Sequence, residues 1–237
     1  MVKAGRPPQD PARQLERAHR ILDAAAGLIE RWGYDKTTID DVARHAGVAK
    51  GTIYLHWRTR DELFAALLRR ERLSMLEEVR EQAPATLRDL IGELAAELVR
   101  RPLMKAIALG DSEVLGKLTR QKRHSETTPE LGAAFEAYLA ELREQGAVHA
   151  DRPAREQLTV IGAVIYGFLF TRNNLPETMR MPDDRLVELI AETADLAVGA
   201  GSAPPAAASH AIARATARYL DTVVEIARNK LATSLGS

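Results

Sequence analysis

"GVAKGTIYLHW", residues 47–57, is the stretch of sequence that decides how this chain folds. A helix buried in a protein core carries mostly residues such as leucine and valine. This stretch instead offers glycine, lysine, threonine, tyrosine and histidine. We expect a short helix over residues 50–56 that holds these polar groups outward together, so the surface that it meets must be polar.

A second short helix is predicted just before this one. The hydroxyl of Thr38 can cap its N-terminus, with an acidic residue three positions on. Gly47 ends it, because the turn requires a backbone conformation that a Cβ disfavours. Two helices joined by so short a turn form a helix-turn-helix. Val42, Val48 and Ile53 are placed to form the small core between the two helices.

The outward side chains of residues 50–56 suit the major groove of DNA, which the second helix of a helix-turn-helix enters. Lys50 can neutralise a phosphate or reach a guanine edge, and Gly51 lets the DNA backbone approach closely. Neighbouring polar groups can reach the flanking phosphates. The DNA-contacting residues predicted on these grounds are Thr38, Lys50, Gly51, Thr52, Tyr54, His56 and Arg60. The alternative is an ordinary pair of helices whose polar face meets only solvent.

The N-terminal segment "KAGRPPQ", residues 3–9, offers a second mode of DNA contact. Pro7 and Pro8 hold the backbone extended. A basic arm of this kind can follow the minor groove, where arginine inserts at the most negative potential. We predict such a contact for Arg6, and the alternative is a disordered tail that contacts nothing.

The 237 residues have a formal net charge of zero, but the charges are unevenly distributed. Residues 1–72 carry 14 Lys and Arg against 10 Asp and Glu, whereas the rest of the chain carries 19 against 23. The basic part is also the part with the helix-turn-helix, which favours a polyanionic partner.

The composition is typical of a cytoplasmic protein. No cysteine is available for disulfides or thiolate metal sites, which fits a reducing compartment. The first twenty residues lack the apolar segment of a signal peptide. The longest apolar run, residues 158–170, is too short to span a bilayer. We therefore expect a cytoplasmic protein without a membrane partner.

Helical periodicity continues through the rest of the chain. Ala, Leu, Glu and Arg dominate, alternating β-branched runs are absent, and Gly or Pro interrupt the pattern at helix-length intervals. The predicted fold class is all-α. The further helices expected are residues 11–32, 59–82, 86–101, 129–146, 153–174, 183–199 and 210–231, with another that begins at Pro102. The helix over 59–82 has no internal Pro or Gly, so it should move as a rod.

Two of these helices are too apolar for the surface of a monomer. The helix over 153–174 is apolar on all sides in its second half, so both sides must be covered. The helix over 183–199 carries an apolar stripe from Leu186 to Ala197. Two such helices can meet their two-fold copies in a four-helix interface, which predicts a homodimer.

A small-molecule site is predicted among the middle helices. Such sites are mainly apolar with a few polar anchors. The candidate residues are Met104, Phe135, Tyr138, Tyr166, Phe170 and Asn173. Each of these is also an ordinary core residue of a helical bundle. Aromatic residues make up only 5% of the chain, which disfavours a large aromatic cage.

The sequence contains no pattern of a catalytic site. It has no cysteine nucleophile, no Gly-x-Ser-x-Gly, no phosphate-binding loop and no HExxH. We therefore predict neither enzymatic activity nor a cofactor or metal. The main alternative to a DNA-binding protein is an all-helical carrier of small molecules or lipids that has lost DNA binding, and the outward residues of 50–56 argue against it.

Residues 20–68 resemble the DNA-binding domain of the tetracycline-repressor (TetR) family of bacterial regulators. The motifs that carry the resemblance are "GYDKTT", "DVARHAGVAKGTIYLHW" and "RTRDEL". The resemblance carries the family's DNA contacts to the residues named above and adds Arg44. Trp57 departs from the family, which usually has Phe there. The larger ring should change local packing without altering function.

The resemblance implies an all-helical homodimer that acts as a transcriptional repressor. Residues 1–60 would form the arm and the three-helix DNA-binding domain, and residues 61–199 a helical ligand-binding and dimerisation domain. Residues 200–237 would add a linker and an appended C-terminal helix, because the family pattern tends to end near residue 199. The implied partners are a near-palindromic operator in double-stranded DNA and a small-molecule effector that releases it.

Overall fold

A computed structural model describes residues 10–110, 129–201 and 204–236 of the chain. Over these residues the protein is helical, and the only β-type pairing described is the isolated bridge between Val148 and Gly199. The predicted all-α class is confirmed. Among the helices so described, none is both long enough and apolar enough to cross a lipid bilayer.

The helices lie close to the bounds expected from the sequence. They are α1 (Pro11–Trp32), α2 (Ile39–Ala46), α3 (Lys50–His56), α4 (Arg60–Glu81), α5 (Leu87–Arg100), α6 (Pro102–Leu109), α9 (Pro129–Glu144), α10 (Ala154–Asn174), α11 (Asp183–Val198) and α12 (Ser209–Leu235). Two short 3-10 turns, η1 (Glu177–Met179) and η2 (Ala206–Ala208), precede α11 and α12. The helix expected from Pro102 is described as far as Leu109.

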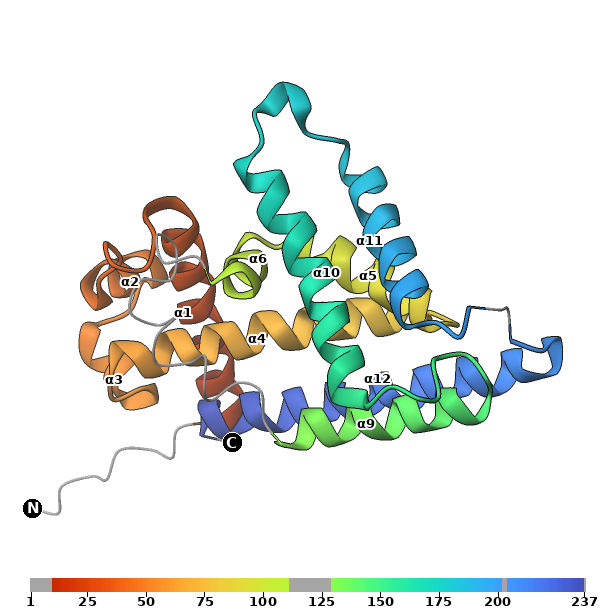
Figure 1. Cartoon of the computed structure of the whole chain (residues 1–237). Coiled ribbons are helices and arrows are strands. Elements are labelled where there is room, and N and C mark those ends of the chain that lie inside the picture. The colour runs from red at the N-terminus through yellow and green to blue at the C-terminus, as the bar shows by residue number, and fades with distance from the viewer. Residues whose placement is uncertain (1–9, 111–128, 202–203, 237) are drawn as a thin grey trace, which may run out of the picture.

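Helix α4 connects two hydrophobic cores, and Figure 1 shows it crossing the molecule from the α1–α3 end to the α5 end. The first core unites α1, α2 and α3 with the start of α4 through residues such as Ile21, Val42, Ile53 and Phe64, all fully buried. Leu103 of α6 also packs into this core. At 1.5 Å per residue, the 22 residues of α4 span about 33 Å.

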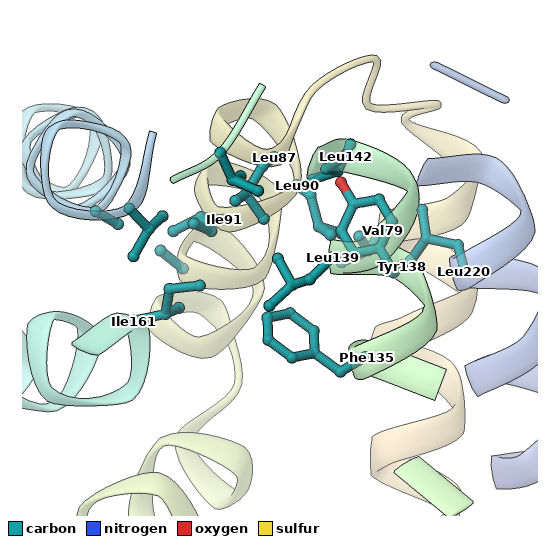
Figure 2. Close-up of a cluster of buried hydrophobic side chains, with 14 of the residues drawn as sticks. Val79, Leu87, Leu90, Ile91, Phe135, Tyr138, Leu139, Leu142, Ile161 and Leu220 are labelled. Carbon is teal, nitrogen blue, oxygen red and sulfur yellow. The ribbon is translucent and has the colours of Figure 1, made fainter. Parts of the chain in front are cut away.

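The second core fills the body of the molecule. Figure 2 shows side chains of α9, including Tyr138 and Leu139, between α5 and Leu220 of α12. Val79 near the end of α4 belongs to the same cluster. The two ends of α4 therefore belong to different cores, which places it where a displacement of one core reaches the other.

The C-terminal helix α12 is an integral part of the packing. It runs alongside α4 and also packs on α9 (Figure 1). Ile212 and Val223 of α12 are buried, and Tyr219 and Ile226 are half-buried. The appended helix thus covers other helices of its own chain.

Candidate nucleic-acid interface

The helix-turn-helix is shaped by local signals in its sequence. Thr38 and Asp41 form a capping box at the start of α2: the Thr38 hydroxyl oxygen accepts from the Asp41 N–H, and the Asp41 carboxylate accepts from the Thr38 N–H. The Thr38 hydroxyl also lies 2.6 Å from that carboxylate, and its hydrogen bond lowers the pKa of Asp41. Gly47 ends α2 in the left-handed region, with φ 63° and ψ 38°.

The predicted small core holds α3 by one face. Val42 and Ile53 are fully buried, and Val48 packs partly buried against the same cluster. The opposite face of α3 is therefore turned to solvent, with Lys50, Gly51 and Tyr54 exposed and Thr52 half-buried. This arrangement agrees with the orientation that the sequence predicts.

Lys50 forms an ion pair on the exposed face of α3. Its ammonium lies 2.8 Å from the Asp40 carboxylate of α2, and both side chains are at least half exposed. The hydrogen bond and the negative charge of Asp40 raise the pKa of Lys50, so the ammonium is protonated at neutral pH. A phosphate that binds Lys50 has to share the ammonium with the Asp40 carboxylate or displace that carboxylate. The sequence did not single out Asp40.

Gly51 has no internal packing reason to be glycine. A Cβ built there would meet nothing within 4 Å, and the residue is an exposed part of helix α3. Glycine weakens a helix relative to alanine. The missing side chain therefore suits the close approach of another molecule, as the sequence suggested.

The end of α3 carries two exposed large side chains. Tyr54 is 45% exposed and Leu55 is 65% exposed. Leu55 was not predicted as a contact residue, although an apolar side chain here can meet a thymine methyl group. A signal for it existed in the sequence: Ile53 takes the core position of α3, and a residue two positions further along a helix points elsewhere.

Arg44, His56 and Arg60 lie at the margins of this surface. The exposed Arg44 pairs with Asp41 at 3.2 Å. His56 is half-buried with its ring 5.3 Å from that of Trp57, and burial together with the charge of Arg17 lowers its pKa.

The guanidinium of Arg60 lies 3.9 Å from the ring centroid of Tyr34 and donates to the Tyr34 carbonyl. Arg60 thus ties the start of α4 to the segment between α1 and α2, and any phosphate contact comes in addition to that role. Arg6, the predicted minor-groove residue, lies outside the described residues.

The six predicted ligand residues do not gather in one place. Met104 is buried, and Phe135 and Tyr138 belong to the body core, where the Tyr138 hydroxyl lies 2.9 Å from that of Thr216. Burial is the main reason that the pKa of Tyr138 is raised. Tyr166, Phe170 and Asn173 lie on exposed positions of α10.

A cavity of about 360 Å³ opens between α10, α11 and the segment that joins them. Its lining is mainly apolar, with Val164, Phe168 and Met181 among the residues, and includes Arg172 and Arg180. Its volume and its apolar lining with a few polar groups are typical of small-molecule sites. The residues that line this cavity include none of the six predicted from the sequence. Several lining residues are, however, sequence neighbours of Tyr166, Phe170 and Asn173 on α10.

One face of α10 is apolar and uncovered in the single chain. Leu158, Tyr166 and Phe170 are 40–49% exposed, and the rings of Tyr166 and Phe170 stack with centroids 5.6 Å apart. Leu196 on the adjacent helix α11 is 84% exposed. The sequence expectation that both sides of α10 are covered is therefore not met within one chain.

A helix-turn-helix with a solvent-facing second helix, carried on an all-helical body, defines a DNA-binding regulator. Residues 21–67 match the model of bacterial regulatory proteins of the tetR family. The HTH-type transcriptional regulator YvkB of Bacillus subtilis is 26% identical over 173 residues, covering 71% of this chain and 90% of that protein. The HTH-type transcriptional repressor Rv1474c of Mycobacterium tuberculosis is 29% identical over 157 residues, covering 65% and 80%.

Solved structures show the same fold. A tetR-family regulator from Shewanella sp. PV-4 aligns with a TM-score of 0.53 at 18% identity, over 77% of this chain and 98% of its own. SmeT in complex with triclosan aligns with a TM-score of 0.50 at 20% identity, over 80% and 96%. The resemblance of residues 20–68 to the TetR family of transcriptional regulators, drawn from the sequence, is confirmed.

Proposed function

We propose that this protein is a cytoplasmic repressor, not an enzyme, that binds a near-palindromic DNA operator as a homodimer and is released by a small molecule. The observation that carries the proposal is the exposed face of α3. It presents Lys50, Gly51 and Tyr54 to solvent on a helix anchored by Ile53. The relatives include a protein named as a transcriptional repressor, which supports the direction of regulation.

The face of α3 has the chemistry of a major-groove reader. Lys50 supplies a cation, and Gly51 allows the DNA backbone to approach α3 closely. The exposed Tyr54 offers a hydroxyl group, and the exposed Leu55 offers an apolar contact. The predicted contacts of Thr38, Arg44, Thr52, His56 and Arg60 would flank these. Phosphate contacts set the register of such a helix, and base-edge contacts set its sequence preference.

The uncovered face of α10 supports the homodimer. The stacked and exposed rings of Tyr166 and Phe170 form an apolar patch of a kind that marks protein interfaces. A two-fold axis beside α10 and α11 would bury this patch against its own copy. Residues 61–199 would then form the ligand-binding and dimerisation domain that the sequence predicts.

The cavity between α10 and α11 is the place where the structure best supports an effector. It adjoins the proposed dimer helices, so a ligand there can change how two copies sit together. The two recognition helices must be about 34–36 Å apart to enter successive major grooves. An effector that alters this separation lowers DNA affinity, with a coupling of about 1–3 kcal/mol in typical allosteric proteins.

A network of ion pairs joins the body to the DNA-binding core. Asp23 of α1 pairs with Arg70 of α4 at 2.6 Å, and Arg70 pairs with Glu71 at 3.2 Å. Arg101, between α5 and α6, lies 3.8 Å from Glu71 and 2.6 Å from the buried Glu97. A shift of α5 or α6 therefore acts on α4 and α1 through charged contacts as well as through packing.

The proposal is tested by selecting bound sequences from a pool of random DNA duplexes. We expect the purified protein to enrich a near-palindromic motif whose half-sites are centred about one helical turn apart. The double variant Lys50→Ala/Tyr54→Ala should enrich nothing, whereas Glu136→Ala, an exposed change on α9, should enrich the parent's motif. No enrichment by the parent would support the carrier alternative.

The effector is tested with any compound that releases the selected duplex in a screen. Linkage requires that the duplex weaken binding of the compound by the same factor as the compound weakens binding of the duplex. Calorimetric titration with and without saturating duplex measures this factor. Equal affinities of the compound in the two titrations would refute the ligand-responsive mechanism.

A further inference from the structure

Trp57, the residue that ends α3, is joined to the far end of the chain. Its indole Nε1–H donates to the backbone carbonyl of Ser234, 3.0 Å away in the last turn of α12. Carbonyls in the last turn of a helix have no partner within the helix. Trp57 is only 3% exposed, so its N–H depends on this acceptor. A phenylalanine here would keep an aromatic ring but would leave the carbonyl without this donor.

Two further contacts hold the same end of α12. Leu235 packs against the hydrophobic core of the DNA-binding helices. The guanidinium of Arg69 on α4 donates to the Ser234 hydroxyl oxygen. One turn earlier, Leu231 is buried in a cluster with Leu73 of α4. The last turns of α12 are therefore docked on both α4 and the DNA-binding core, as Figure 1 shows for the C-terminus.

The other end of α12 is fixed in the body. Thr216 lies 2.9 Å from the hydroxyl of Tyr138 on α9, and the ring of Tyr219 stacks on that tyrosine with centroids 4.8 Å apart. Between the ends, Arg228 pairs with Glu77 of α4 at 2.9 Å. The helix has 27 residues with no internal Pro or Gly, so it is a stiff rod of about 40 Å.

The position of Trp57 connects this rod to the recognition helix. The Trp57 backbone N–H caps the carbonyl of Ile53, the buried anchor of α3, at 2.9 Å. We infer that Trp57 and the last turn of α12 are positioning elements that fix the end of α3 relative to the body. The ring size of Trp57 alone predicts no effect on function, but the hydrogen bond of its indole N–H gives the residue a positioning role. A loosened α3 has to be ordered when DNA binds, which lowers affinity.

The first test needs no DNA and so stands apart from the proposed function. The chain has two tryptophans, and Trp57→Phe assigns their indole N–H signals in a nitrogen-15 spectrum. We expect the Trp57 indole proton to exchange with water more slowly than that of Trp32, which is 38% exposed. Truncation after residue 233 should bring the two rates together and speed amide exchange in residues 50–56. Unchanged rates after truncation would overturn the inference.

The second test rests on the proposed role of α3 and uses the duplex selected by the parent protein. Trp57→Phe should weaken binding by about two- to tenfold, the range expected for one lost hydrogen bond. The truncation also removes the Arg69 contact and Leu235, so it should weaken binding by at least as much. Combining them should cost no more than the truncation alone, because the truncation already removes the acceptor of the Trp57 hydrogen bond. Ser234→Ala keeps the carbonyl and removes only the hydroxyl, with its contacts to Arg69 and to the Lys230 carbonyl, so it should bind as the parent does.

The outcomes separate the inference from the proposed function. Additive losses, unchanged affinity or tighter binding in the two variants would each overturn the positioning role. If Trp57→Phe fails to fold, the truncation still decides, because it changes no residue of the DNA-binding helices. If the parent protein selects no duplex, the proposed function is refuted. The hydrogen-exchange measurement still tests the contact between Trp57 and α12 in that case.

Discussion

Replacing Gly51 with alanine should stabilise the protein and weaken its binding to DNA. A methyl group at this position meets no atom within 4 Å, and the backbone of residue 51 is helical. Glycine-to-alanine changes at such sites raise the free energy of unfolding by about 0.4–1 kcal/mol. For a chain of this size, that corresponds to roughly 1–4 °C in Tm.

The loss of DNA affinity should be larger than this gain in stability. The added methyl group occupies space that the account assigns to the DNA backbone. It should cost about 1–3 kcal/mol of binding, comparable to the loss of one contact in such interfaces and at least fivefold in affinity. Thermal unfolding and fluorescence anisotropy with the selected duplex measure the two effects separately.

The chain provides a matched control in Gly27. This residue is also an exposed helical glycine with nothing within 4 Å of a built Cβ, but it lies on α1. Gly27→Ala should give a similar rise in Tm with unchanged DNA affinity. The reasoning is refuted if Gly51→Ala binds the duplex as tightly as Gly27→Ala does.

Three other changes test separate parts of the account. Asp40→Asn should tighten duplex binding by up to about fivefold, the upper range for an exposed ion pair, and this gain should shrink when Lys50 is already glutamine. Phe170→Asp should shift sedimentation from dimer to monomer, whereas Thr222→Asp, an exposed change on α12, should not. The folded-state pKa of His56 is below the unfolded value of 6.5, so protonation favours unfolding. As pH falls from 7.5 through 6.5 to 5, the parent should lose Tm relative to His56→Gln, and a constant difference would contradict this.

The sequence predicted the features that depend on near neighbours in the chain. The Thr38 capping box, the Gly47 turn and the burial of Val42 and Ile53 all follow from residues a few positions apart. Helix bounds were close for the same reason, since caps and prolines act locally. The outward orientation of α3 then followed from which positions its core required.

Contacts between distant segments were beyond such reasoning. Lys50 meets Asp40 only because the turn brings the start of α3 beside the start of α2. Trp57 meets Ser234 across 177 positions, and no periodicity relates the two. These contacts depend on how whole helices pack, which local patterns do not specify.

The small-molecule site shows the same limit. The sequence points to aromatic residues for this site, but in the body core Tyr138 stacks on Tyr219 and Phe135 meets both rings edge-on. The cavity lies between α10 and α11 beside smaller residues such as Ala163 and Gly167. A cavity forms where side chains fail to fill space, so large residues in the sequence are poor guides to its position.

In the proposed function, α3 lies against the bases of an operator. The chain has no cysteine, so Leu55→Cys creates a single attachment point for a photo-activated cross-linker on α3. Glu78→Cys, exposed near the far end of α4, is the matched control. We predict that irradiation with the selected duplex links residue 55 to bases within each half-site and leaves residue 78 unlinked. Equal cross-linking from both positions, or none from residue 55 when the duplex is saturated, would contradict the account.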